Sequence, residues 1–259
     1  MSRRAAARLA AALIGLAAAT AWSSGPSPLR SGFDTMGPTT QAMQRDDASN
    51  PGMLSVREGE TLWSTPAGEA RRRCADCHGD ARISMRGAAA RHPRWDETLG
   101  APVSLSQRIA LCRERHQGAP RGAPESRERL ALAAWVGQAS RGLPVEPDPD
   151  PRLAPARERG RALFGRRIGQ LDLSCADCHD DRWGLRLGGS TIPQGHANGY
   201  PLYRLEWQAL GSLQRRLRGC LAGVRAEPWP SDASEWTELE LFLQRRGAGL
   251  PVETPAVRP

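Results

Sequence analysis

The sequence predicts a mostly α-helical protein made of two tandem, related domains. Three segments of the chain recur in the same order, which is strong evidence of an internal duplication. The recurring pairs are residues 57–63 with 158–164, residues 104–112 with 212–220, and the pentapeptide Gly-Leu-Pro-Val-Glu at 142–146 with 249–253. Each domain is therefore roughly 100 residues long, which is an ordinary domain size.

The predicted domain boundaries follow the composition of the chain. The first domain covers residues 56–146 and the second covers residues 155–259. Residues 147–154 form a linker between them, because alternating Pro and Asp cannot continue a helix and should be extended. Residues 22–55 are rich in Ser, Pro, Gly and Thr, so we expect a poorly ordered N-terminal segment.

Helices are predicted at matching places in the two repeats. Ser104 and Ser212 are start signals for helices that run into Cys112 and Cys220. No run of residues shows convincing strand alternation. The other predicted helices cover residues 57–63, 125–138, 157–164 and 234–246.

The N-terminus is typical of an exported protein. Arg3, Arg4 and Arg8 precede an apolar run from Leu9 to Ala21 that is too short to span a bilayer comfortably. The run ends in Ala-Thr-Ala, an A-x-A cleavage site. We therefore expect a signal peptide at residues 1–21 and a periplasmic mature protein with no membrane span.

The charge of the chain alone would allow nucleic acid as a partner. The formal net charge is +8, and all 36 basic residues are Arg. However, the sequence contains no nucleic-acid-binding motif, so we expect no such partner. Arg binds oxyanions through two parallel hydrogen bonds, which Lys cannot provide.

Two C-x-x-C-H motifs carry the clearest chemistry. On a helix, positions i, i+3 and i+4 share one face, so two thiols can bond the vinyl groups of a haem while the His reaches its iron. A redox dithiol or a zinc site is the alternative, but the His, the two copies and the export signal all argue against it. The sequence thus predicts two covalently bound c-type haems, in two cytochrome c-like domains. The motif residues are Cys74, Cys77 and His78, and Cys175, Cys178 and His179.

Two cysteines remain outside the motifs, Cys112 and Cys220, at equivalent places in the repeats. A disulfide between them is one possibility in an oxidising compartment. The other is that each is the sixth iron ligand, a position that Met fills in ordinary cytochromes c. The second half contains no Met, and its only side-chain candidates are Cys220 and His196, a residue expected in an ordinary loop.

In the first half, Met85 and His92 are weaker candidates than Cys112, and His116 is expected on the surface. Only a cysteine has a counterpart in both repeats. We therefore expect Cys112 and Cys220, with His78 and His179, to be the iron ligands.

These residues resemble the SoxA family, the diheme subunits of the SoxAX complex in bacterial thiosulfate oxidation. The resemblance runs from about residue 57 to residue 259, and single-haem members of the family lack the first haem motif that this chain retains. The segment around Cys220 is the most specific. Besides the haem motifs, the resemblance rests on residues 111–115, 198–201, 215–220, 224–228 and 246–251.

The resemblance implies an L-cysteine S-thiosulfotransferase. Such an enzyme joins thiosulfate oxidatively to a cysteine of the carrier SoxYZ, and the haem subunit SoxX takes the two electrons onward. It also implies that Cys220 acts as a cysteine persulfide as well as an iron ligand, and that Arg216 binds substrate. The haem of the first half is implied to be remote from the reaction.

The repeats differ in charge near their extra cysteines. Arg246 and Arg218 align with Ala139 and Ala110, so the second half is expected to hold an anion, with Arg246 gripping it from a second side. Two other functions remain open. They are a thiosulfate dehydrogenase that makes tetrathionate, and a non-catalytic diheme electron-transfer cytochrome.

Overall fold

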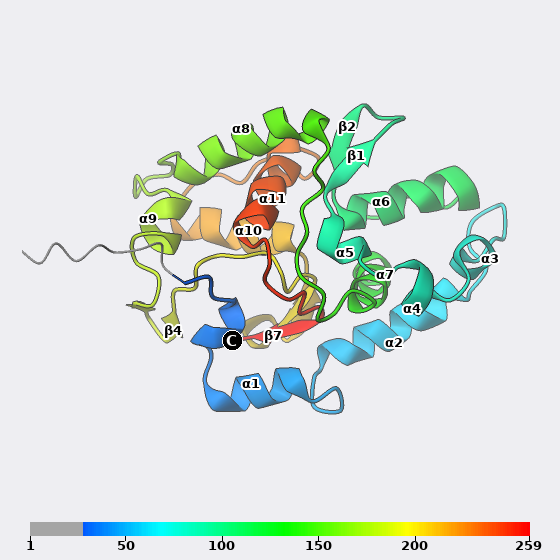
Figure 1. Cartoon of the computed structure of the whole chain (residues 1–259), viewed down its shortest axis with the longest axis horizontal. Coiled ribbons are helices and arrows are strands. Elements are labelled where there is room, and N and C mark those ends of the chain that lie inside the picture. The colour runs from blue at the N-terminus through cyan, green and yellow to red at the C-terminus, as the bar shows by residue number, and fades with distance from the viewer. Residues whose placement is uncertain (1–27) are drawn as a thin grey trace, which may run out of the picture.

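The computed structural model of the chain describes residues 28–259, and this part is about half helical with seven short strands. The predicted signal peptide, residues 1–21, lies outside the described residues. The two C-x-x-C-H segments form the short helices α3 (Cys74–His78) and α9 (Cys175–His179), which lie at opposite ends of the molecule in Figure 1. No helix of residues 28–259 is both long enough and apolar enough to cross a membrane.

The first half is built on the crossing of α2 (Gly52–Trp63) and α7 (Arg127–Gln138). A Cβ atom on Gly59 would collide with the backbone carbonyl of Ala131, so only glycine permits this close approach. The other elements of this half are α3, α4 (Ala81–Ser84), α5 (Ala88–Arg91), β1 (Arg94–Asp96), β2 (Ala101–Val103), α6 (Leu105–Cys112) and the π-helix η2 (Arg113–Gln117).

The second half repeats this crossing with α8 (Ala154–Gly165) and α11 (Ser234–Arg246). Gly160 meets the carbonyl of Glu238 as Gly59 meets that of Ala131. The strand β5 pairs with β6 antiparallel and with β7 in parallel. The other elements are η3 (Pro151–Leu153), α9, β3 (Arg186–Leu187), β4 (Ser190–Thr191), β5 (Leu202–Arg204), η4 (Leu205–Trp207), β6 (Ala209–Gly211), α10 (Leu213–Gly223) and β7 (Ala256–Arg258).

The predicted helix starts are confirmed. The Ser104 hydroxyl accepts a hydrogen bond from the amide of Gln107 at 3.2 Å, and the Ser212 hydroxyl accepts one from the amide of Arg215 at 3.1 Å. The structure also contains short strands, although no run of the sequence shows convincing strand alternation. Each strand of residues 28–259 is two or three residues long, which is too short for alternation to be visible in the sequence.

The expectation of a poorly ordered N-terminal segment is wrong for residues 28–55. These residues form η1 (Gly32–Thr35), α1 (Pro38–Arg45) and the start of α2, and they lie along the C-terminal strand β7. The Asn50 side chain donates to the carbonyl of Pro255 at 2.9 Å, and the Gln44 side chain accepts from the amide of Val257 at 3.0 Å. Composition does not reveal this order, because the partners lie at the other end of the chain.

The two repeat-ending pentapeptides hydrogen-bond to each other. The Gly142 amide donates to the Val252 carbonyl at 2.8 Å, and the equivalent Gly249 amide donates to the Val145 carbonyl at 2.9 Å. The two halves therefore meet symmetrically at this point. The predicted linker is irregular over residues 147–150, but its end is part of the fold, since η3 forms there and Leu153 is fully buried.

Candidate functional site

The ring of His179 is held by a backbone carbonyl. Its Nδ1 donates a hydrogen bond to the Pro193 carbonyl at 2.7 Å, so the proton sits on Nδ1 and Nε2 keeps a free lone pair. Burial lowers the pKa of His179, which keeps the ring neutral. A metal-binding His commonly has such a partner, so His179 fits the role of an axial iron ligand.

A cavity of about 140 Å³ brings His179 together with Arg216 and Cys220. Arg216 precedes Cys220 by one turn of α10, so the two side chains share a face of that helix. Burial, to which the neighbouring Cys220 adds, raises the pKa of the Cys175 thiol to about 11. The extra cysteine therefore lies close to its own haem-attachment segment.

None of the six cysteines forms a disulfide. In the first half, burial raises the pKa of Cys74, to which Cys112 adds, and burial likewise raises the pKa of Cys112, to which Cys77 adds. Each extra cysteine is thus close to its own motif, which does not favour a bridge between the halves. Two thiols, a His and an opposing Cys in each half fit a covalently bound haem.

The alternative ligands of the first half are engaged elsewhere. Met85 packs against the hydrophobic core of α2 and α7. The Nδ1 atom of His92 lies 2.8 Å from the Ala88 carbonyl, and His116 is on the surface as predicted. His78 itself is exposed, with its ring centroid 5.7 Å from that of Trp63.

Arg216 carries a charge that no carboxylate of residues 28–259 neutralises by an ion pair. The other arginines that line the cavity are paired: Arg204 lies 2.7 Å from Glu206, and Arg258 lies 2.5 Å from Glu253. The free guanidinium of the cavity therefore lies beside Cys220. Such a group can bind an oxyanion through charge-assisted hydrogen bonds.

The counterpart of Arg216 in the first half is Arg108, and its guanidinium is already engaged in an ion pair with Asp96. Arg108 lies 2.5 Å from Asp96, and Arg115 lies 2.8 Å from the same carboxylate, whose side chain is 1% exposed. Hydrogen bonding to Arg115, with the charge of Arg108, holds the pKa of Asp96 well below its usual range. The two extra cysteines thus have equivalent sequence positions but different electrostatic surroundings.

The chain is similar to known proteins in sequence and in fold. Residues 58–145 match the SoxA/TsdA cytochrome c domain. The chain is 38% identical over 220 residues to the L-cysteine S-thiosulfotransferase subunit SoxA of Pseudaminobacter salicylatoxidans, covering 85% of this chain and 77% of the relative. This chain belongs to the SoxA family.

Two further comparisons agree. SoxA of Rhodovulum sulfidophilum is 37% identical over 230 residues, covering 89% of this chain and 80% of that protein. The crystal structure of SoxXA from P. pantotrophus matches with a TM-score of 0.85 at 32% identity, covering 89% of this chain and 87% of that chain. The fold is therefore cytochrome c-like, and cytochromes c bind their haem covalently.

In this SoxA-family chain, Arg246 lies on the His179 side of the site. Its guanidinium pairs with Asp180 at 2.7 Å and donates to the Gln194 carbonyl at 3.1 Å. It also lies over the ring of Phe164, 4.6 Å from the centroid. Arg246 does not line the cavity that holds Cys220, so the expected second grip on an anion is not seen.

Arg218 also lies away from Cys220. Its guanidinium lies 5.3 Å from the centroid of the Trp236 ring, and it lines a separate surface depression with Glu227. The halves therefore differ in whether the arginine before the extra cysteine is paired, and the residues that differ are Arg216 and Arg108 rather than Arg218 and Arg246.

Three further residues line the cavity although the sequence did not predict them as part of the site. His196, expected in an ordinary loop, lines the cavity, and burial lowers its pKa to about 4. Met36, from the N-terminal segment, lines it too. Tyr200 is a third, and its only sequence signal was membership of the Asn-Gly-Tyr-Pro run.

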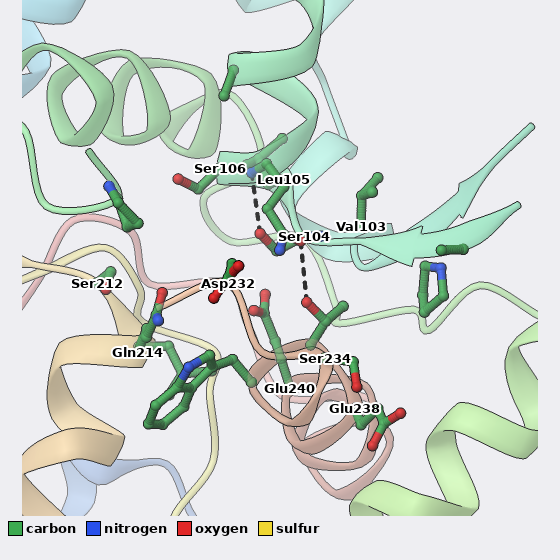
Figure 2. Close-up of a pocket in the computed structure, with 18 of the residues that line it drawn as sticks. Val103, Ser104, Leu105, Ser106, Ser212, Gln214, Asp232, Ser234, Glu238 and Glu240 are labelled. Atoms are coloured by element: carbon green, nitrogen blue, oxygen red, sulfur yellow. Dashed lines mark hydrogen bonds between the residues drawn. The ribbon is translucent and has the colours of Figure 1, made fainter. Parts of the chain in front are cut away.

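A larger cavity of about 780 Å³ lies between the two halves (Figure 2). It is lined by the starts of α6 and α10 and by α11, from which Glu240 reaches into it, and no Cys or His borders it. Burial raises the pKa of Glu240 to about 7. This cavity is therefore separate from the redox residues, although Tyr200 borders both cavities.

Proposed function

We propose that this chain is a diheme SoxA subunit that oxidatively couples thiosulfate to the carrier cysteine of SoxYZ in the periplasm. The observation that carries the proposal is the unpaired guanidinium of Arg216 one turn before Cys220, in contrast to Arg108 before Cys112, whose guanidinium is bonded to Asp96. An oxyanion would find an unengaged guanidinium one turn before the extra cysteine in the second half, whereas the equivalent guanidinium of the first half is already bonded to a carboxylate.

In this proposal each C-x-x-C-H segment holds one haem, and the two halves arose by internal duplication. His78 and Cys112 would ligate one iron, and His179 and Cys220 the other. Bound haem supplies one-electron redox chemistry. The symmetric hydrogen bonds of the two pentapeptides and the matched close crossings at Gly59 and Gly160 support the duplication.

The chain's own residues divide the work on the substrate. Arg216 holds the sulfonate end of thiosulfate, and Cys220, as thiolate or persulfide, handles the outer sulfur. In the overall reaction, the carrier thiolate and the thiosulfate dianion form one S–S bond, giving a cysteine S-thiosulfonate with one negative charge and releasing two electrons. SoxX, the partner subunit, carries those electrons away.

The decisive experiment compares Cys220→Ser with Cys112→Ser in the complex with SoxX, using thiosulfate and SoxYZ. We expect Cys220→Ser to retain two haems by mass after denaturation but to lose turnover, while Cys112→Ser keeps most of it. Near-normal turnover in Cys220→Ser would favour an electron-transfer cytochrome. Robust tetrathionate formation from thiosulfate alone would favour a thiosulfate dehydrogenase.

The proposed location has a separate test. Sequencing the N-terminus of the protein from its native host should show cleavage after Ala21, so that the chain begins near Trp22. A chain that begins at Met1 would contradict the periplasmic assignment.

A further inference from the structure

The hydroxyl of Tyr200 has no hydrogen-bond partner among residues 28–259, although Tyr200 lines the cavity that holds Arg216 and Cys220. Its ring packs against the core of the second half, beside Leu213 and Leu243. The paired arginines of this cavity, Arg204 and Arg258, already donate to carboxylates. Tyr200 and Arg216 are therefore free to donate to a ligand, as are the hydroxyls of Ser190 and Thr191 on β4, which also line the cavity.

Tyr200 keeps its proton at physiological pH. Burial raises the pKa of its phenol to about 12, and the charges of Arg216 and Cys220, which act on the phenol in opposite directions, are the next largest influences. A neutral hydroxyl can donate to an anion without adding negative charge to the site. This property distinguishes it from a carboxylate in the same place.

We propose that the Tyr200 hydroxyl donates a hydrogen bond to a sulfonate oxygen of thiosulfate. The inference rests on the proposed function, since it concerns the substrate of the same site. A sulfonate group has three oxygens, and a guanidinium fork of Arg216 engages two of them. The third oxygen requires a donor from elsewhere, and Tyr200 supplies it from the loop before β5. Tyr200 is thus a substrate-binding residue.

The experiment measures the thiosulfate dissociation constant of the oxidised, haem-loaded complex with SoxX by calorimetry. Tyr200→Phe should weaken binding by about 10- to 100-fold, as expected when one hydrogen bond to a charged group is lost. The matched control is Tyr203→Phe, because Tyr203 lies on β5 and packs against the core of the first half. That variant should bind thiosulfate like the unmodified protein.

Arg216→Ala separates the two hypotheses. If Arg216→Ala weakens binding and Tyr200→Phe does not, the role of Tyr200 is refuted while the proposed function stands. If neither variant weakens binding, the site itself is wrong.

A second measurement covers the case in which Tyr200→Phe does not fold. The chain has two tyrosines, so incorporating 3-fluorotyrosine into the Tyr203→Phe variant labels Tyr200 alone. The more acidic phenol is a stronger donor and should tighten thiosulfate binding. An unchanged or weaker affinity would overturn the proposal.

Discussion

Arg108 and Asp96 form an ion pair at 2.5 Å, and the equivalent arginine of the second half, Arg216, has no such partner in the described chain. Asp96 lies on β1, in a short hairpin with β2 that follows α5. Asp96 therefore occupies the guanidinium of Arg108 in the first half. The equivalent guanidinium of Arg216 in the second half remains available to bind an anion. Helices α6 and α10, which occupy equivalent places in the two repeats, can therefore perform different work.

The first prediction compares these two arginines. Arg216→Ala should raise the KM for thiosulfate by the equivalent of about 1.5–3 kcal/mol, because a hydrogen bond to a charged group is lost. Arg108→Ala should leave that KM unchanged and instead lower the free energy of unfolding, since Asp96 keeps only Arg115. Steady-state assays measure the KM of each variant, and urea titrations measure its free energy of unfolding. An equal effect of the two substitutions on KM would contradict the asymmetry.

The second prediction concerns Cys112. Cys112→Met should shift the spectrum and the reduction potential of the first haem, because a thioether is a weaker donor than a thiolate. Turnover with SoxX and SoxYZ should mostly survive. Low-temperature EPR and redox titration report the ligand change, and Cys220→Met, which should lose turnover, is the control. Loss of turnover in a folded, two-haem Cys112→Met protein would show that the roles of the halves are misassigned.

The third prediction concerns Arg246, which ties Asp180 to the loop whose Pro193 carbonyl holds His179. Arg246→Ala should change the spectrum and potential of the second haem, and Asp180→Asn should produce a similar change. The affinity for thiosulfate should fall much less than in Arg216→Ala. If Arg246→Ala weakens thiosulfate binding and leaves the spectrum unchanged, the original expectation that Arg246 grips the anion is the better one.

The fourth prediction concerns the pH dependence of stability. The pKa of folded Glu240 is about 7, above the ordinary value of 4.5, so between these values the folded chain holds a proton that the unfolded chain has released. Stability should therefore fall as the pH rises through this window, by about 3 kcal/mol at most.

Glu240→Gln should remove this dependence. The variant should be more stable than the unmodified protein at pH 8 and nearly equal to it at pH 4, as measured by urea titration. The exposed Glu227 provides the control, Glu227→Gln, which should change neither value. A parallel pH profile for Glu240→Gln and the unmodified protein would count against an uncharged Glu240.

The fifth prediction concerns the crossing of α8 and α11. Gly160→Ala should destabilise the fold by about 3 kcal/mol, the upper end of the cost of overpacking, because the new methyl group meets the backbone carbonyl of Glu238. Gly165→Ala lies on the same helix with open space around it, so it should be neutral or slightly stabilising. Thermal unfolding of the two variants gives the comparison, and equal melting temperatures would be incompatible with the crossing.

Local sequence patterns were sufficient to predict much of the helical structure of this protein. The Ser104 and Ser212 caps and the helix over residues 234–246 follow from local spacing or from comparison of the two repeats. Such features depend on backbone hydrogen bonds and helical geometry, which neighbouring residues determine. The resemblance to the SoxA family was likewise confirmed by the comparisons.

Only the tertiary structure decided which charges are free and which segments complete the site. Arg108 is paired because Asp96, which lies twelve residues before Arg108 in the chain, accepts a hydrogen bond from its guanidinium. Arg216 has no such carboxylate partner among the described residues. Arg246 forms an ion pair with Asp180. Residues 28–55 adopt a defined structure because they hydrogen-bond to the C-terminal residues of the chain. The physical reason is that an ion pair or a buried hydrogen bond requires two groups within a few ångströms, and sequence separation does not determine that distance.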